Sequence, residues 1–347
     1  MKKRLLLAFV LLLGLLVAAC SSNDEAPSTD DGDSATTEES SGDTIELKIG
    51  HIAPPEHSYT KGIEIFAEKV EERTDGRVTF EIFGDGQLGG EREIIEQVQL
   101  GSLDLTVATA GVVGSFVPEL SVLEMPFLFN DVEEAYEVLD GEIGEELMAK
   151  IEEQGFKALG MWENGMRHIV NNKQPVHTPE DMASLKMRTV ENDLYIETYR
   201  ALGTDATPIA FPEAYTSLEQ GVVDGQDLSI GVMVTTKMYE VQNHLTENGI
   251  YYAAAPIFMN ADKFAELPED IQEVIVEVAK EVTDEQRQIN QDMEVEQKEF
   301  LKEEGVEIVE PSAEEMAAFQ EAVQPVYDKL SDQFDGLVEQ IQEQLGK

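Results

Sequence analysis

From residue 44 onward, short stretches with a two-residue apolar period alternate with stretches of helical period, and this alternation constrains the fold most. Ile45, Leu47 and Ile49 would lie on one face of the first strand. The pattern predicts strands over 44–50, 78–83 and 103–109, and helices over 63–70 and 91–100. Strands that alternate with helices form a largely parallel sheet, so the sequence predicts an α/β fold.

The second half of the chain continues the pattern and adds one unusually long helix. It predicts strands over 157–162, 185–189 and 222–224, and helices over 193–202 and 211–221. Pro212 at the first helical position and Gly221 just past the last are typical helix boundaries. No Gly or Pro interrupts 269–304, where apolar residues keep one helical stripe. We expect a helix of about 30 residues there, roughly 45 Å long.

The amino-terminal segment has the pattern of a secretory signal. Three basic residues precede an apolar run from Leu5 to Ala19, and small residues lead to Cys20. The run is shorter than the roughly 20 residues of a membrane-spanning helix. We therefore predict a signal peptide over 1–19 and lipidation of Cys20, the only cysteine.

Residues 20–43 are acidic and carry almost no apolar side chains, which predicts a disordered tether. The whole chain holds 71 acidic against 24 basic residues, a formal net charge of −47. Such a charge excludes nucleic acid as a partner. It also suggests a protein adapted to a saline setting, because self-repulsion destabilises a compact chain at low salt.

The segment Gly84–Gly89 (GDGQLG) has the spacing of a dinucleotide-binding loop between a strand and a helix. However, Glu91 and Glu93 occupy the helix start, where a pyrophosphate would need bare amide groups. We interpret the segment as a tight turn and the two acids as stabilising the start of their own helix.

Motifs of catalysis and metal binding are missing from the sequence. The five histidines form no HExxH pair, and neither a GxSxG elbow nor a phosphate-binding GxxxxGK[ST] loop occurs. We expect no catalytic residues, no metal and no cofactor.

Several short motifs together carry a family resemblance. They are WENGMR (162–167), LKMRT (185–189), ALG (201–203), PIAF (208–211), EAY (213–215) and GVVDGQ (221–226), joined by FGDGQLGG (83–90), LGSLD (100–104) and FVPE (116–119). With them the chain resembles, from residue 45 to about 310, the solute-binding subunits of tripartite ATP-independent periplasmic (TRAP) transporters, in the DctP-type dicarboxylate-binding family and in its lipoprotein form.

The resemblance implies a periplasmic-binding-protein-like fold of two α/β lobes with crossing strands. A long helix over about 268–303 would span both lobes. Lobe I would comprise 44–165 plus 253–285, and lobe II 166–252 plus 286–347.

The resemblance also implies a ligand site. Arg188 matches the family arginine that forms a bidentate salt bridge with the ligand carboxylate, a geometry suited to a planar guanidinium. Arg167 matches a second cleft arginine, which either contacts ligand or forms a structural ion pair. Phe211 matches an aromatic that packs on the ligand, with plain core packing as the alternative. The other predicted ligand-binding residues are Leu228, Asp227, Thr109, His51, Asn164 and Trp162.

Two departures from the family pattern bear on the ligand. Asp-Gly-Gln is usually followed by Glu-Asn-Pro, but here by Asp227, Leu228 and Ser229, so an amide contact is replaced by an apolar one. Sialic-acid-binding members carry Glu and Arg where this chain has Thr109 and Val112. We therefore expect a compact organic or keto acid instead of a large sugar acid.

By resemblance, the function would be capture of a small carboxylate, such as a C4-dicarboxylate or a keto acid, through hinge closure. The protein would be an extracytoplasmic monomer held on the outer face of the cell membrane by lipid on Cys20. It would deliver the ligand to the small and large membrane subunits of a transporter driven by an ion gradient. Two alternatives stay open: a ligand-sensing lipoprotein for a receptor, and a secreted enzyme acting on organic acids.

Overall fold

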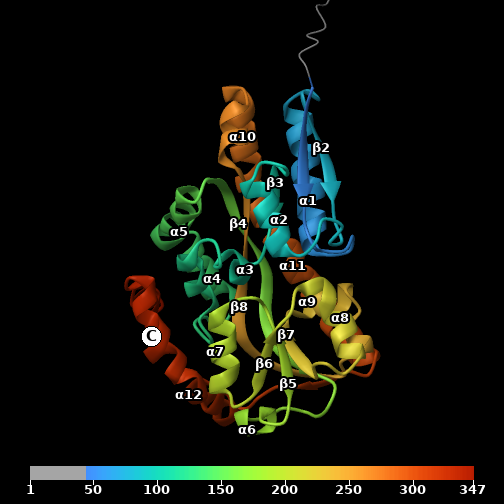
Figure 1. Ribbon diagram of the computed structural model, residues 1–347, viewed down its shortest axis with the longest axis vertical. Helices are drawn as coiled ribbons and strands as arrows, with labels where there is room; N and C mark the ends of the chain where they lie inside the picture. Colours follow the sequence, from blue (N-terminus) through green and yellow to red (C-terminus); the bar gives the residue numbers. More distant parts are fainter. Residues whose placement is uncertain (1–43) are drawn as a thin grey trace, which may run out of the picture. The chain divides into compact units, whose positions relative to one another are not determined.

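A computed structural model describes residues 44–347, and the predicted signal peptide, Cys20 and tether lie outside the described residues. Within 44–347, nine strands form one mixed sheet in the order β2-β1-β3-β8-β4-β7-β5-β6, with β9 paired to β8 (Figure 1). The strands are β1 (Ile45–Gly50), β2 (Val78–Phe83), β3 (Leu105–Val107), β4 (Phe156–Asn171), β5 (Lys186–Thr189), β6 (Asp205–Pro208), β7 (Gly225–Leu228), β8 (His244–Asn260) and β9 (Glu307–Val309). The predicted α/β class is confirmed.

The two long strands β4 and β8 join two halves of this sheet. They run antiparallel from the pair Phe156 and Asn260 to the pair Asn171 and His244. At one end β8 carries β3, to which the parallel strands β1 and β2 are added. At the other end β4 carries β7, followed by the parallel strands β5 and β6. Each half is thus a small parallel sheet, and the two crossing strands confirm the two-lobed arrangement.

Helices cover both halves of the sheet. They are α1 (Ser58–Arg73), α2 (Glu91–Gln99), α3 (Ala110–Val113), α4 (Val132–Leu139), α5 (Glu142–Glu153), α6 (Pro179–Met182), α7 (Asp193–Ala201), α8 (Phe211–Glu219), α9 (Ile230–Thr235), α10 (Ala261–Glu266), α11 (Glu269–Glu303), α12 (Ala313–Leu330) and α13 (Leu337–Gln344). Short 3-10 helices lie at Pro118–Glu124, Met238–Glu240 and Ser331–Phe334.

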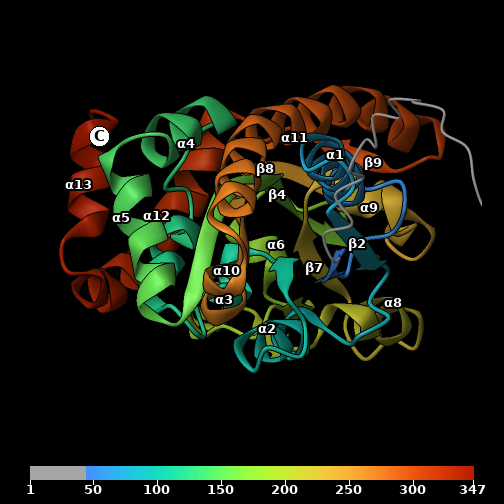
Figure 2. The same ribbon diagram turned by 90° about the horizontal axis from the view of Figure 1, so that it is seen from above.

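The predicted long helix is confirmed as α11, which has 35 residues. It packs against α1 in one half, against the crossing strand β4, and against α9 in the other half (Figure 2). Its buried residues include Ile271, Ile275 and Val278 near the start, and Gln286 and Asn290 further along. The apolar stripe therefore anchors α11 to one half, and polar side chains follow where it reaches the crossing strands.

The strand predicted over 222–224 is wrong, because β7 begins only at Gly225. The amide groups of Val222 and Val223 both donate to the carbonyl of Ser217 and so close the end of α8. Gly221 adopts a φ of 70°, which lets the chain make this turn. Amides used to cap a helix cannot also pair in a sheet.

Two other predicted strands have the wrong length. The strand expected over 103–109 is limited to 105–107, since Thr109 already caps α3. The strand expected over 157–162 extends to Asn171. Its register shifts three times, between Ala158 and Gly160, Glu163 and Gly165, and Arg167 and Ile169. These irregularities, together with buried polar residues, break the alternation by which a strand is recognised.

The lobe boundaries stay a prediction. The limits at 165/166, 252/253 and 285/286 fall inside β4, β8 and α11, so the chain passes without interruption from one half to the other. At the carboxyl terminus, α13 returns to α4: the Gln344 side chain donates to the carbonyl of Glu137 at 3.0 Å. Apolar residues of both helices share one core.

Candidate ligand-binding site

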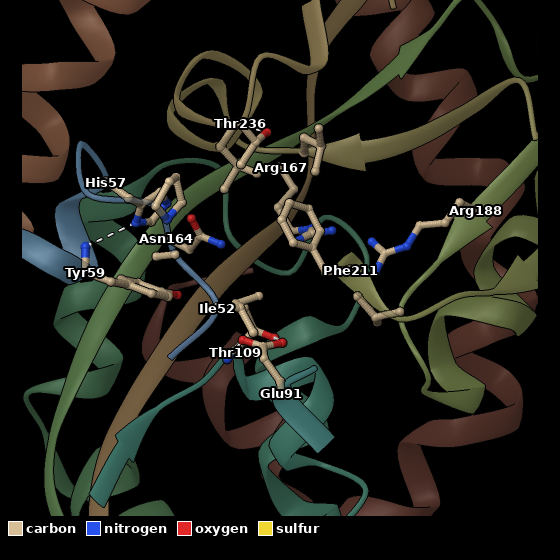
Figure 3. Close-up of a pocket in the computed structure, with 15 residues that line it drawn as sticks. Ile52, His57, Tyr59, Glu91, Thr109, Asn164, Arg167, Arg188, Phe211 and Thr236 are labelled. Carbon is tan, nitrogen blue, oxygen red and sulfur yellow. Dashed lines mark hydrogen bonds between the residues drawn. The ribbon is translucent and has the colours of Figure 1, made fainter. Parts of the chain in front are cut away.

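A pocket with about 460 Å³ of empty space lies where the two halves of the sheet meet (Figure 3). It is lined by Ile52, Ala53, Pro54, His57, Tyr59, Glu91, Thr109, Asn164, Arg167, Arg188, Val190, Phe211, Leu228, Val232 and Thr236. The loops after β1 and β3 contribute from one half, and the ends of β5 and β7 from the other. The carboxyl ends of parallel strands are where α/β proteins place their ligands.

Arg188 is a buried guanidinium whose charge is unpaired within the described residues. It is 3% exposed, and its Nε donates to the carbonyl of Ile209 at 2.9 Å. Neither Nη atom has a hydrogen-bond partner in residues 44–347, and the Phe211 ring centroid lies 5.6 Å from Cζ. Burial, followed by the charge of Arg167, lowers the pKa of Arg188 to about 10. The free edge of this guanidinium points into the pocket (Figure 3).

Arg167 differs because the protein itself supplies its counterion. Its Nε lies 2.5 Å from Oδ2 of Asp227, and Nη2 donates to the Asp227 carbonyl at 2.7 Å. The other carboxylate oxygen of Asp227 accepts from the Tyr199 hydroxyl at 2.5 Å. Burial lowers the pKa of Arg167, but Asp227, Tyr195 and Glu124 together outweigh burial and raise it. The structural ion pair, one of the two alternatives left open, is therefore present, and Arg167 also lines the pocket.

Glu91 is a pocket residue that sequence reasoning missed. Glu91 begins α2, three residues after the turn at 85–88, and the predicted turn is confirmed. It lies with Glu93 in the first turn of α2, where acids stabilise a helix start. Its two carboxylate oxygens accept from the Thr109 amide and the Thr109 hydroxyl, both at 2.8 Å, instead of from the amides of its own helix. Burial raises its pKa, while the bonds from Thr109 oppose the rise. The only signal for this role in the sequence was an acid two residues after the glycine loop.

The wall opposite Arg188 is polar but uncharged. His57 caps α1, with its Nδ1 accepting from the Tyr59 amide at 3.1 Å. Burial lowers the pKa of His57 to about 4, so the ring is neutral at pH 7. The Tyr59 hydroxyl is buried without a hydrogen-bond partner in residues 44–347. Asn164 accepts from the Ser229 hydroxyl at 3.2 Å. Hydrogen-bonding groups are thus available here without a second cation.

The chain matches the family model of bacterial extracellular solute-binding protein family 7, DctP, over residues 49–333. It belongs to this family. The match covers the pocket and both halves of the sheet, and it confirms the resemblance noted from the motifs.

Relatives of this family-7 protein agree with the assignment. A solute-binding protein of Verminephrobacter eiseniae is 44% identical over 63% of this chain and 65% of its own length. The C4-dicarboxylate-binding periplasmic protein DctP of Rhodobacter capsulatus is 31% identical over 84% of this chain and 87% of its own. These are binding proteins and not enzymes.

A solved structure shows the same fold. The TRAP periplasmic solute-binding protein of Polaromonas sp. JS666, bound to D-erythronate, has a TM-score of 0.83 and 38% identity, covering 86% of this chain and 98% of its own. This likeness confirms the two-lobed architecture expected of the family.

Six of the nine predicted ligand-binding residues line the pocket of this family-7 protein: Arg188, Arg167, Phe211, Leu228, Thr109 and Asn164. The other three are buried and do not line the pocket. Trp162 is fully buried in the core beside α1, and Asp227 is 1% exposed beneath Arg167. His51 is 1% exposed, with its ring about 3.0 Å from where a Cβ on Gly84 would be. Ligand contact remains a prediction for the six residues that line the pocket.

Residues 44–347 contain no group of three or more His, Cys, Asp or Glu side chains placed to hold a metal ion. In the same part of the chain, no helix is long and apolar enough to cross a membrane.

Proposed function

We propose that the protein captures a small organic acid in this pocket, with the acid's carboxylate bound by Arg188. The proposal rests on the two Nη atoms of Arg188, which have no hydrogen-bond partner in residues 44–347 although the guanidinium is buried and its Nε donates to Ile209. A guanidinium held in this way presents two parallel donors, which match the two oxygens of a carboxylate.

Capture would proceed by closure of the two halves around the ligand. Arg188 and Leu228 reach the pocket from β5 and β7 in one half, whereas Glu91 and Thr109 reach it from the starts of α2 and α3 in the other. Sealing an unpaired guanidinium away from water costs several kcal/mol, and an incoming carboxylate removes that cost. Ligand therefore favours the closed state over the open one, as hinge-closing binding proteins require.

The flexible points would lie in the strands that cross between the halves. Gly165 of β4 has a φ of 88°, and the register of β4 against β8 shifts on either side of Met166. Backbone irregularities of this kind let a long strand bend without breaking the sheet.

In the cell, the protein would deliver its ligand to the small and large membrane subunits of a TRAP transporter. The family match and the periplasmic relatives support transport across the membrane. The sequence supports export by a signal over 1–19, anchoring through lipid on Cys20 and a tether over 20–43. We further propose that the protein acts as a monomer.

A thermal-shift screen of small carboxylates tests ligand capture. A ligand present at 100 times its dissociation constant should add about 2.7 kcal/mol to the free energy of unfolding. We expect at least one carboxylate to raise Tm, and its uncharged amide to have no effect. Equal shifts from an acid and its amide would contradict the role of the carboxylate.

A further inference from the structure

Glu91 and Arg188 face the same pocket from opposite halves of the sheet without contacting each other. Figure 3 shows the Glu91 carboxylate and the Arg188 guanidinium both directed into the pocket. No ion pair joins them among residues 44–347, although each is close enough to influence the other's pKa. The space between the Glu91 carboxylate and the Arg188 guanidinium therefore suits a ligand that carries a hydrogen-bond donor for Glu91 and an acceptor for Arg188.

The Glu91 carboxylate keeps hydrogen-bonding capacity for a ligand. Thr109 supplies one donor to each oxygen, while an ionised carboxylate accepts about four hydrogen bonds. Its two contacts with Thr109 also fix its orientation. A hydroxyl group that entered the pocket would meet a positioned acceptor, whereas a second carboxylate would meet a like charge.

The charges around the pocket are balanced before any ligand enters. Among the lining residues the cations are Arg167 and Arg188. Asp227 neutralises Arg167, and Glu91 faces Arg188. His57 adds no charge at pH 7. One ligand carboxylate leaves a single excess negative charge in a buried site, and a dicarboxylate leaves two, which is much more costly away from water.

We propose that this site selects a small hydroxy monocarboxylate, whose carboxylate binds Arg188 and whose hydroxyl group donates to Glu91, and that it discriminates against dicarboxylates. This inference rests on the proposed function and narrows the ligand class expected from the sequence. The Tyr59 hydroxyl, which has no hydrogen-bond partner among the described residues 44–347, could bind a further hydroxyl group of the ligand at the uncharged wall.

Three acids with the same four-carbon skeleton test the effects of hydroxyl groups and of a second carboxylate on binding: D-erythronate, butanoate and succinate. We would measure their dissociation constants by calorimetry on the wild type, on Glu91→Gln, and on Glu93→Gln. Glu93 is exposed on the same first turn of α2 and is not a lining residue, so its variant matches the change in net charge. Circular dichroism and Tm would check that each variant is folded.

For the wild type and Glu93→Gln, we expect D-erythronate to bind at least tenfold more tightly than butanoate or succinate. In Glu91→Gln, the preference for D-erythronate over butanoate should fall about tenfold, the scale of one charge-assisted hydrogen bond. The affinity for succinate should rise. If Glu91 had a purely structural role, Glu91→Gln would weaken the binding of all three acids by the same factor.

The wild-type data alone decide the inference if Glu91→Gln does not fold. If succinate or butanoate binds the wild type as tightly as D-erythronate, selection for a hydroxy monocarboxylate is overturned while carboxylate capture stands. If none of the three acids binds, and no carboxylate in the thermal-shift screen does either, both the inference and the proposed function fail.

Discussion

Asp227 holds Arg167 through two contacts, from its carboxylate at 2.5 Å and from its own carbonyl at 2.7 Å. Arg188 is equally buried, and within residues 44–347 its only hydrogen bond is to the carbonyl of Ile209. The Arg167 charge is thus paired within the protein, whereas we propose that a ligand anion pairs with Arg188. This difference has opposite consequences for stability and for binding.

Replacing Asp227 should destabilise the ligand-free protein, while replacing Arg188 should not. Asp227→Asn leaves the Arg167 charge buried without its partner, for which we expect a loss of about 3–5 kcal/mol in the free energy of unfolding. Arg188→Met keeps the apolar stem and removes an unpaired charge, so its stability should stay within about 1 kcal/mol of the wild type or exceed it. Urea unfolding without ligand measures both. A larger loss from Arg188→Met than from Asp227→Asn would reverse the assignment.

The stability of the protein should depend on pH through Glu124. Burial raises the pKa of this carboxyl to about 7, although the Arg167 charge opposes the rise. Because the folded-state pKa lies above the unfolded value, the native state binds more protons between about pH 4.5 and 7. Stability from this group is therefore full below pH 4.5 and is lost as pH rises through 7, by at most about 3 kcal/mol.

Glu124→Gln isolates this effect from other titrations. His51, His57 and His168 have pKa values lowered by burial and act in the opposite sense, since the folded protein resists their protonation. Their contributions cancel when the variant is compared with the wild type at each pH. We expect the Tm of Glu124→Gln relative to the wild type to rise between pH 5 and pH 8. A constant difference would show that Glu124 titrates normally.

Much of the fold could be predicted because the parallel halves follow local rules. The first two strands, the helices beginning near Glu91 and Phe211, and the long helix α11 all carry regular apolar periods. The strand β8 was not predicted, and β4 was predicted too short. Both are long strands buried along most of their length, so apolar and polar residues do not alternate along them.

Site residues could be predicted from the sequence only where a family motif links one residue type to one role in ligand binding. Arg188 and Phe211 were found through the family motifs, but nothing in a helix that starts with Glu91 shows that its carboxylate turns toward Thr109. Conversely, Trp162 belongs to a motif near the pocket yet points into the core, and His51 is buried with its ring against Gly84. Side-chain direction at irregular strands depends on bulges that a sequence does not display.

Salt should accelerate ligand association. The full sequence has a formal net charge of −47, which repels an anion from the pocket. At about 1 M salt the screening length falls to about 3 Å, so distant carboxylates of the protein no longer repel the ligand. The contact with Arg188 is weakened much less, because it is shielded from solvent. We expect stopped-flow association rates of a carboxylate ligand to rise from about 0.05 M to about 1 M sodium chloride. A falling rate would show that the local potential of the two arginines dominates.

Removal of residues 1–43 should leave affinity unchanged. All lining residues of the pocket lie between Ile52 and Thr236. Calorimetry on the truncated and full-length proteins checks this expectation. In the cell, Cys20→Ser should release the protein from the membrane fraction; membrane retention of this variant would contradict lipid anchoring.

The most direct measurement is a calorimetric titration of the cognate carboxylate into Arg188→Lys. The variant keeps the positive charge but loses the planar pair of donors, and we expect binding to weaken by about 2 kcal/mol or more. Arg200→Lys is the matched control, because Arg200 is exposed on α7 and does not line the pocket. We expect wild-type affinity for Arg200→Lys and at least about a thirtyfold loss of affinity for Arg188→Lys. Equal affinity of Arg188→Lys and the wild type would contradict this expectation.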